Sequence, residues 1–232
     1  MRKEPLREMP QRDNKDLFFG DAWRVFRIIS EFVDGFETLT EIGPSVSIFG
    51  SARLKPASPY YNLAIDVGQK LGERGFAVIT GGGPGIMEAA NRGAQSVDSK
   101  SCGLAIDLPM ESEINPFCDS KYSLKFRYFF VRKVMFIRYA QGYVFLPGGV
   151  GTLDELFEAL TLIQTEKIKP FPIYLMGKKY WEGLLKWLVD PVLSSGCISQ
   201  EDLDRINLSD DPEEVVAGIE AHFQQSHTLK NF

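Results

Sequence analysis

Residues 144–156 (VFLPGGVGTLDEL) join an apolar run to an amphipathic pattern through a glycine-rich turn. The apolar run suits a buried parallel strand, and the apolar side chains after the turn recur at helical spacing. Gly148, Gly149 and Gly151 carry no Cβ, so a ligand can approach their amides closely. The helix expected to begin near Thr152 adds unpaired N–H groups and a partial positive charge. This arrangement predicts a site for an anion such as a phosphate.

Two acidic residues, Asp154 and Glu155, fall in the first turn of that predicted helix. Thr152 and Glu155 have the spacing of a capping box, in which both side chains bond backbone N–H groups. Glu155 equally suits a catalytic carboxylate beside the anion, and the spacing leaves both roles open. Asp154 points about 100° away from Glu155 around the helix, so we assign it a structural role.

A second glycine-rich turn, residues 81–85 (GGGPG), separates a predicted strand at residues 76–80 from a predicted helix at residues 86–94. It holds more glycine than a tight turn needs, which favours close approach of a ligand. The residues expected to meet the ligand here are Gly82, Gly83 and Gly85.

A third turn follows the predicted strand at residues 46–49 and holds Ser51 and the cation Arg53, so it is another candidate ligand edge. Neither glycine-rich turn has the GxGxxG spacing of dinucleotide sites, and the chain has no GxxxxGK[ST] phosphate loop. The sequence therefore disfavours hydride transfer and nucleoside triphosphate hydrolysis.

Residues 147–155 (PGGVGTLDE) resemble the PGGxGTxxE signature of the LONELY GUY family. Residues 81–90 (GGGPGIMEAA), which include Met87, match a recurrent glycine-rich motif of the family's nucleotide site, and Arg132 and Lys133 correspond to its arginine–lysine pair. Members are often labelled "lysine decarboxylase". The resemblance implies instead a phosphoribohydrolase, which cleaves the N-glycosidic bond of nucleoside 5′-monophosphates, including AMP and cytokinin riboside monophosphates.

Glycosidic cleavage passes through an oxocarbenium-like ribose, which a carboxylate beside C1′ can stabilise. We therefore expect Glu155 to be catalytic. The resemblance implies a catalytic role for Arg132 too, which from the residues alone also fits a surface charge. No metal and no organic cofactor is expected. The residues expected to bind the substrate are Gly148, Gly149, Gly151, Thr152, Lys133, Gly82, Gly83, Gly85, Met87 and Ser51.

Two rival functions belong to other classes. One is a nucleotide-binding module without catalysis, such as the molybdenum-cofactor carrier proteins that share the general fold, which have no clear need for Glu155. The other is a pyridoxal-phosphate amino-acid decarboxylase, suggested only by the family's label, because no lysine has a context that marks a Schiff base.

Alternating strands and helices predict one α/β domain over residues 21–225, a doubly wound, mostly parallel Rossmann-like sheet of about five to seven strands with helices on both faces. Residues 1–20 are expected to form a flexible segment and residues 226–232 a tail. Asp21 is expected to cap a helix that runs towards residue 39 with one apolar face. That helix either covers the sheet, which we favour, or binds a partner.

Residues 125–133 interleave basic and aromatic side chains, a pattern of single-stranded nucleic-acid binding. The net charge of −5 argues against a nucleic-acid polymer as partner, and helical spacing favours a core-facing helix. Residues 109–122 fit either a lid or a subunit contact. The aromatic richness of this helix and of the N-terminal one predicts a homodimer or higher homo-oligomer.

Cys102, Cys118 and Cys197 form no CxxC pair, which suits a reducing compartment. No stretch reaches the length of a membrane span, so we expect a soluble cytoplasmic protein that binds no membrane. The two histidines, His222 and His227, lie near the C-terminus, far from the glycine turns. A Ser-His-Asp triad or a histidine-rich metal site is therefore not expected.

Overall fold

The computed structural model describes residues 14–107, 113–226 and 231. The predicted tail lies almost wholly outside these residues, as do residues 1–13 of the predicted N-terminal segment and residues 108–112 at the start of the predicted lid or subunit contact.

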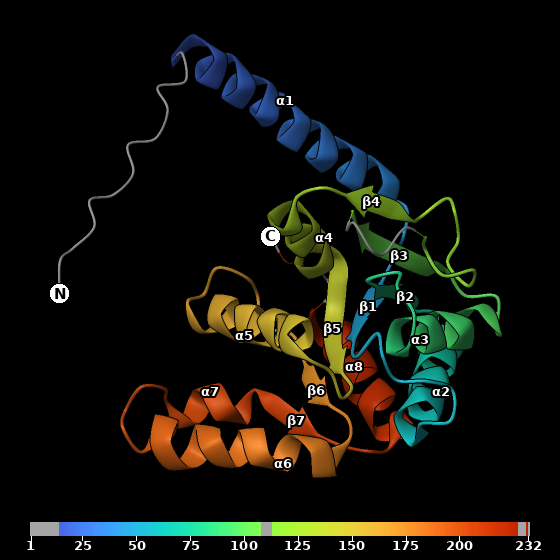
Figure 1. Cartoon of the computed structure of the whole chain (residues 1–232). Helices are drawn as coiled ribbons and strands as arrows, with labels where there is room; N and C mark the ends of the chain where they lie inside the picture. Colours follow the sequence, from blue (N-terminus) through green and yellow to red (C-terminus); the bar gives the residue numbers. More distant parts are fainter. Residues whose placement is uncertain (1–13, 108–112, 227–230, 232) are drawn as a thin grey trace, which may run out of the picture.

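One parallel sheet of seven strands, in the order β4-β3-β2-β1-β5-β6-β7, forms the centre of the molecule (Figure 1). The strands are β1 (Ser45–Phe49), β2 (Ala77–Thr80), β3 (Ser101–Ile106), β4 (Leu124–Phe126), β5 (Ala140–Phe145), β6 (Ile173–Leu175) and β7 (Ile206–Leu208). The chain adds strands on one side of β1 and then returns to β5 on the other side. The predicted doubly wound sheet is confirmed, and its switch point lies between β1 and β5.

Helices cover both faces of the sheet. They are α1 (Asn14–Leu39), α2 (Pro59–Glu73), α3 (Ile86–Gln95), α4 (Phe129–Tyr139), α5 (Val150–Gln164), α6 (Lys178–Trp187), α7 (Gln200–Asp204) and α8 (Pro212–Ser226), with a π-helical turn at Leu188–Leu193. Helices α2, α3 and α8 share one core with Val46 and Ile48, whereas α4, α5 and α6 share the other with Tyr143 and Phe145. Because alternate residues of β1 and β5 face opposite layers, these central strands are buried on both faces.

Helix α1 differs from its prediction. It begins before Asp21, which therefore lies inside the helix and is no cap, and residues 14–20 are helical rather than a flexible segment. The later part packs on the core through Ile28, Phe32 and Phe36. The earlier described part runs away from the sheet (Figure 1), so the predicted covering role holds only for the end of the helix.

Candidate active site

Three loops meet at the carboxyl ends of β2, β1 and β5. Ser51 N–H, after β1, donates to the Pro147 carbonyl after β5 at 3.0 Å. The Ser51 carbonyl accepts from Ile86 N–H, at the start of α3, also at 3.0 Å. The structure thus brings the three turns that were predicted to bind a ligand together at the switch point, where open α/β sheets bind ligands.

Of the two roles left open for Glu155, the start of α5 contradicts the capping box. Gly149 is the N-cap and the helix begins at Val150, so Thr152 is the third helical residue. No side chain caps this end. Thr152 instead packs against Gly148, where a Cβ would overlap its side chain. Glu155 is consequently not explained as a capping residue.

The same helix start is open to a ligand. A Cβ built on Gly149 or Gly151 would meet nothing within 4 Å, and both residues are exposed, so open space lies beside the turn. The helix terminus adds a partial positive charge. Tyr180 holds the glycine-rich turn in place, because its hydroxyl donates a hydrogen bond to the Gly148 carbonyl at 2.5 Å. This is the geometry that an anion site requires.

Glu155 lies one turn further along α5 and is only 5% exposed. Burial raises its pKa from 4.5 to about 7, against the opposing effect of the nearby cations Lys133 and Arg132. The carboxylates of Glu158 and Asp154 raise it further. Oε2 of Glu155 is buried without a hydrogen bond, so a ligand or water can use it. A carboxyl with a pKa near neutrality can act as an acid or a base.

Lys133 reaches from α4 into a group of three carboxylates on α5. Its Nζ lies 2.8 Å from Asp154 Oδ2, 2.9 Å from Glu158 Oε2 and 3.8 Å from Glu155 Oε2. Burial lowers the pKa of Lys133, but hydrogen bonds to Asp154 and Glu158 outweigh that effect and leave the pKa raised. Asp154 therefore helps to hold Lys133 beside Glu155.

Arg132 connects the catalytic candidate to the second glycine turn. Its Nη2 lies 3.9 Å from Glu155 Oε1, and Nη1 lies 3.9 Å from where a Cβ of Gly81 would be. The rings of Phe129 and Phe136 lie 5.1 and 5.6 Å from its guanidinium carbon. These cation–π contacts fix the guanidinium in the site, so Arg132 is not a surface charge.

The second glycine turn lies against Met87, whose side chain would meet a Cβ on Gly81 or Gly83. Gly82 and Gly85 both have a φ of +71°, which favours glycine. A cavity of about 70 Å³ opens between this turn and Arg132, and its lining includes Met87, Ile106 and Lys125. The turn thus borders a space of mixed apolar and charged character.

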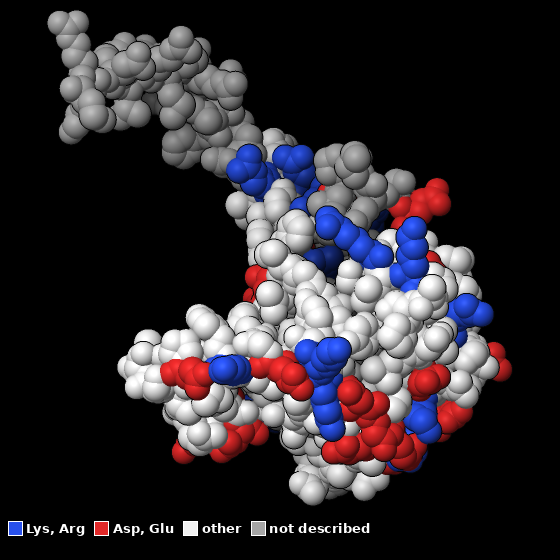
Figure 2. All heavy atoms as spheres, turned by 60° about the horizontal axis from the view of Figure 1, so that its bottom comes forward, with Lys and Arg blue, Asp and Glu red and all other residues white. Residues whose placement is uncertain are grey.

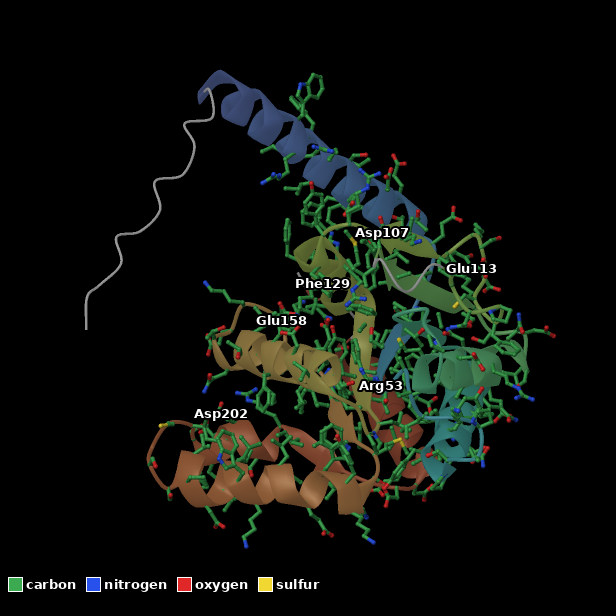
Figure 3. The ribbon with its side chains drawn as sticks, in the orientation of Figure 1. Arg53, Asp107, Glu113, Phe129, Glu158 and Asp202 are labelled. Atoms are coloured by element: carbon green, nitrogen blue, oxygen red, sulfur yellow. The ribbon has the colours of Figure 1, made fainter. Side chains whose placement is uncertain are left out.

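Glu158 and Tyr143 are site residues that the sequence reasoning missed. Figure 3 shows Glu158 on α5 below Phe129, which begins α4, and Arg53 on the loop after β1. Glu158 could have been found from its spacing, because it lies four residues after Asp154 and three after Glu155 on one helix. The Tyr143 hydroxyl is buried without a hydrogen bond, and burial, followed by the charge of Glu155, raises its pKa well above the usual value. Tyr143 could not be recognised as a site residue from the sequence, because it lies inside a predicted strand.

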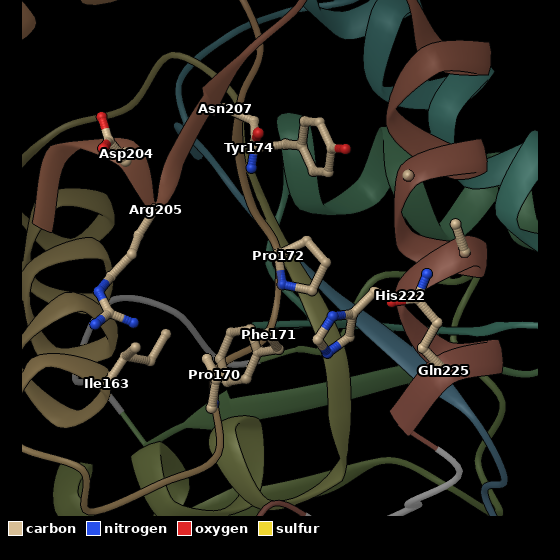
Figure 4. A pocket seen from close by; sticks show the side chains of 12 residues that line it. Ile163, Pro170, Phe171, Pro172, Tyr174, Asp204, Arg205, Asn207, His222 and Gln225 are labelled. Atoms are coloured by element: carbon tan, nitrogen blue, oxygen red, sulfur yellow. The ribbon is translucent and has the colours of Figure 1, made fainter. Parts of the chain in front are cut away.

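A separate groove of about 410 Å³ lies beside β6, β7 and α8 (Figure 4). His222 and Arg205 face it from opposite sides, with Pro172 between them. It shares no lining residue with the three loops. His222 is therefore outside the candidate active site, whereas His227 lies outside the described residues.

Within the described part of the chain, no group of three or more His, Cys, Asp or Glu side chains could hold a metal ion. Among the same residues, no helix is both long and apolar enough to cross a membrane.

The family model described as "Possible lysine decarboxylase" matches residues 87–219. The chain is 30% identical over 163 residues to the cytokinin riboside 5′-monophosphate phosphoribohydrolase LOG of Oryza sativa subsp. japonica, which covers 69% of this chain and 65% of the relative. It is 33% identical over 136 residues to the pyrimidine/purine nucleotide 5′-monophosphate nucleosidase of Escherichia coli K12, covering 51% of this chain and 28% of that protein. The chain thus spans less than two thirds of the length of either relative.

A molybdenum cofactor binding protein from Rippkaea orientalis has a similar structure, with a TM-score of 0.55 and 21% identity, over 77% of this chain and 96% of that one. This likeness concerns the fold alone.

Proposed function

Because the chain belongs to the LONELY GUY family, whose model is described as "Possible lysine decarboxylase", we propose that it hydrolyses the N-glycosidic bond of nucleoside 5′-monophosphates. The products are the free base and ribose 5-phosphate. The observation that carries the proposal is Glu155, a buried carboxyl with a pKa of about 7, close to an open helix terminus and to Arg132. The names of the rice and E. coli relatives support the same reaction.

In the proposed mechanism the 5′-phosphate binds the amides of Gly149 and Gly151 at the start of α5, while Gly148 and Thr152 shape the turn. Arg132 and the second glycine turn, with Met87, contact the rest of the nucleotide. The bond between C1′ and the base nitrogen breaks, and its electron pair leaves with the base, which takes up the proton that water gives to Glu155 and so departs as the neutral free base. Ionised Glu155 stabilises the developing positive charge at C1′ and takes a proton from the water whose oxygen bonds to C1′.

Decarboxylation of lysine on pyridoxal phosphate is not supported by the site. A Schiff-base lysine needs a neutral amine and hence a lowered pKa. Lys133, the lysine beside Glu155, has a raised pKa and two carboxylate hydrogen bonds. We therefore expect no carbon dioxide release from lysine, with or without added pyridoxal phosphate.

A panel of nucleoside monophosphates tests the proposal, with AMP and an N6-substituted AMP included. Chromatography should detect free base and ribose 5-phosphate in equal amounts, and adenosine should be a poor substrate because the anion site stays empty. Equal kcat/KM for AMP and adenosine would contradict phosphate anchoring. Tight binding of AMP without any product would favour the non-catalytic binding module instead.

We also propose that the protein acts in the cytoplasm as a homodimer or higher homo-oligomer. Cys102, Cys118 and Cys197 are all free thiols, which fits a reducing compartment. The support for self-association is the unusually exposed apolar surface of α1, α4 and α5.

A further inference from the structure

The loop at residues 113–122, which precedes β4, lies against the second glycine turn. Asn115, on this loop, is only 8% exposed and bonds the turn twice. Its backbone N–H donates to the Gly82 carbonyl at 2.8 Å, and its side-chain Nδ2 donates to the Gly83 carbonyl at 3.1 Å. Ile114 packs beside the same turn, where a Cβ on Gly82 would lie 3.4 Å from its Cγ2. The loop therefore supports the turn from the side of the protein interior.

The side-chain amide of Asn115 belongs to a closed set of hydrogen bonds. Its Nδ2 also donates to Asn91 Oδ1 at 3.0 Å, and the Thr80 hydroxyl donates to the same oxygen at 2.6 Å. Thr80 Oγ1 in turn accepts from Gly82 N–H at 2.9 Å. Asn115 Oδ1 accepts from Phe117 N–H at 3.1 Å, so both ends of this amide are satisfied. We call Thr80, Asn91 and Asn115 the polar brace, and a satisfied buried network of this kind fixes one geometry.

These bonds fix three successive peptide units of the turn. The unit 81–82 is held through Gly82 N–H, the unit 82–83 through the Gly82 carbonyl, and the unit 83–84 through the Gly83 carbonyl. The N–H and C=O of a trans peptide point in opposite directions, so a Gly82 carbonyl bound to Asn115 directs Gly83 N–H away from the loop. Gly83 and Arg132 both line the cavity of about 70 Å³. The polar brace thus determines which backbone groups the turn presents to a ligand.

The loop is bonded to the fold beyond Asn115 as well. Asp119 N–H donates to the Ser101 carbonyl at 2.7 Å, and Ser101 N–H donates to Asp119 Oδ2 at 2.9 Å. These bonds favour a fixed support over a lid for residues 113–122. Glu113, which lies on this loop (Figure 3), lines the same cavity as Gly83. The anchor at Asn115 therefore places one wall of the cavity as well as the turn.

The general charge of the protein gives an anionic nucleotide little help. On the face seen in Figure 2, acidic side chains lie beside basic ones, and the whole chain has a net charge of −5. Long-range attraction of an anion needs a field of the opposite sign, so binding must depend on donors placed at particular positions. The orientation of the second glycine turn should therefore affect affinity strongly.

We propose that Asn115 is a positioning residue for the substrate. Through the polar brace it holds the second glycine turn, and with it Gly83, in the conformation that binds the nucleotide beside Arg132. This inference rests on the proposed function, which supplies the nucleotide, and adds a residue that acts through the turn rather than on the reacting atoms. Since Glu155 acts at C1′ and Asn115 acts on the turn, loss of the brace should weaken binding much more than it slows the chemical step.

Asn115→Asp tests the proposal, because it keeps the size of the side chain and replaces Nδ2 by an oxygen that faces the oxygens of Gly83 and Asn91. The Kd for AMP, measured by titration calorimetry in a Glu155→Gln background that does not turn over, should rise about tenfold or more. With Glu155 intact, KM for AMP should rise as much while kcat falls less than about threefold. Asn207→Asp is the matched control, since Asn207 Nδ2 also donates to a backbone carbonyl, at 3.2 Å, but lies on β7. It should change none of the three quantities.

A second pair of variants tests the brace without a change to Asn115. Thr80→Val removes the hydroxyl that joins Gly82 to Asn91 and should raise the Kd for AMP in the same direction. Thr80→Ser keeps the hydroxyl and should recover most of the affinity. Circular dichroism establishes that each variant is folded, and the Thr80 pair decides the question if Asn115→Asp does not fold. Unchanged AMP affinity in the folded variants, or a lower kcat with an unchanged KM, would overturn the proposal.

The binding measurement is independent of catalysis. AMP binding that the brace variants weaken, without adenine release by the wild-type protein, would refute the proposed hydrolysis and leave the role of Asn115 standing. Hydrolysis of AMP with the same KM in wild-type and brace variants would do the reverse. A wild-type protein that binds no nucleoside monophosphate would refute both.

Discussion

Replacing Glu155 by Gln keeps the size of the side chain and removes its charge, so it separates catalysis from packing. If the carboxylate stabilises the oxocarbenium ion and accepts the proton from water, kcat should fall by about 10² to 10⁴. In the wild type, kcat/KM should rise with pH through a midpoint near 7, the pKa of Glu155. The variant should lose that dependence.

The same variant should be more stable than the wild type at high pH. A carboxyl whose pKa is raised on folding contributes stability at low pH, and this contribution is lost as the pH rises from about 4.5 through about 7. A difference of about 2.5 pKa units at about 1.4 kcal/mol each is about 3 kcal/mol. Glu155→Gln should therefore gain about 3 kcal/mol over the wild type at pH 8.5 and less than about 0.5 kcal/mol at pH 4.5.

Urea unfolding at the two pH values, with adenine release measured on the same preparations, checks both effects. The control is Glu182→Gln, on the exposed surface of α6, which should change neither quantity. A Glu155→Gln protein with near-normal kcat would refute the catalytic role and favour the binding module. A stability difference that stayed constant between pH 4.5 and 8.5 would refute the buried, near-neutral carboxyl.

Three further predictions concern neighbouring residues. Arg132→Ala should lower kcat/KM for AMP by about 10² or more, and Arg132→Lys should recover little of it in the same assay, because lysine lacks the planar fork. Gly148→Ala should lower the free energy of unfolding in urea by about 1–3 kcal/mol, because the added methyl group crowds Thr152. Gly151→Ala should leave the free energy of unfolding unchanged or slightly higher. It should raise KM for AMP, because the methyl group fills the anion site. Lys133→Gln should move the midpoint of the kcat/KM profile above pH 7, because the ammonium lowers the pKa of the catalytic carboxyl; an unchanged midpoint would count against that coupling.

The central strands could be predicted from sequence because each contains a short, mostly apolar run and is buried on both faces. The strands β4 and β7 were missed. Each is an edge strand of only three residues, which is too short for an alternating pattern to be recognised. Residues 125–133, interpreted as part of a core-facing helix with basic flanks, divide into the end of β4 and the start of α4.

The start of α5 and the exposure of α1 required tertiary information. Sequence rules placed the helix start at Thr152 because threonine caps helices well. Gly149, with φ −93° and ψ −154°, serves as N-cap without any side chain, which moves the start two residues earlier and frees Thr152. For α1, the spacing of apolar residues identifies a face but not what covers it. Only the fold reveals that Trp23 and Phe26 extend beyond the sheet.

Burial is the main reason why Glu155 should exchange a proton near neutrality, and the charges around it modify the effect. Two cations, Arg132 and Lys133, lie among three carboxylates, of which Glu155 is buried, Glu158 is partly exposed and Asp154 is more than half exposed. Asp154 and Glu158 hold Lys133 through direct hydrogen bonds, whereas the contacts of Glu155 with both cations are 3.8 to 3.9 Å long. Glu155 is the buried carboxyl of the three, so burial raises its pKa, and the two cations offset only part of that rise. A phosphate bound at the start of α5 would add negative charge nearby and raise the pKa of Glu155 further, so the midpoint of kcat should lie at a higher pH than that of kcat/KM. Identical midpoints for the two profiles would mean that the phosphate binds too far from Glu155 to act on it.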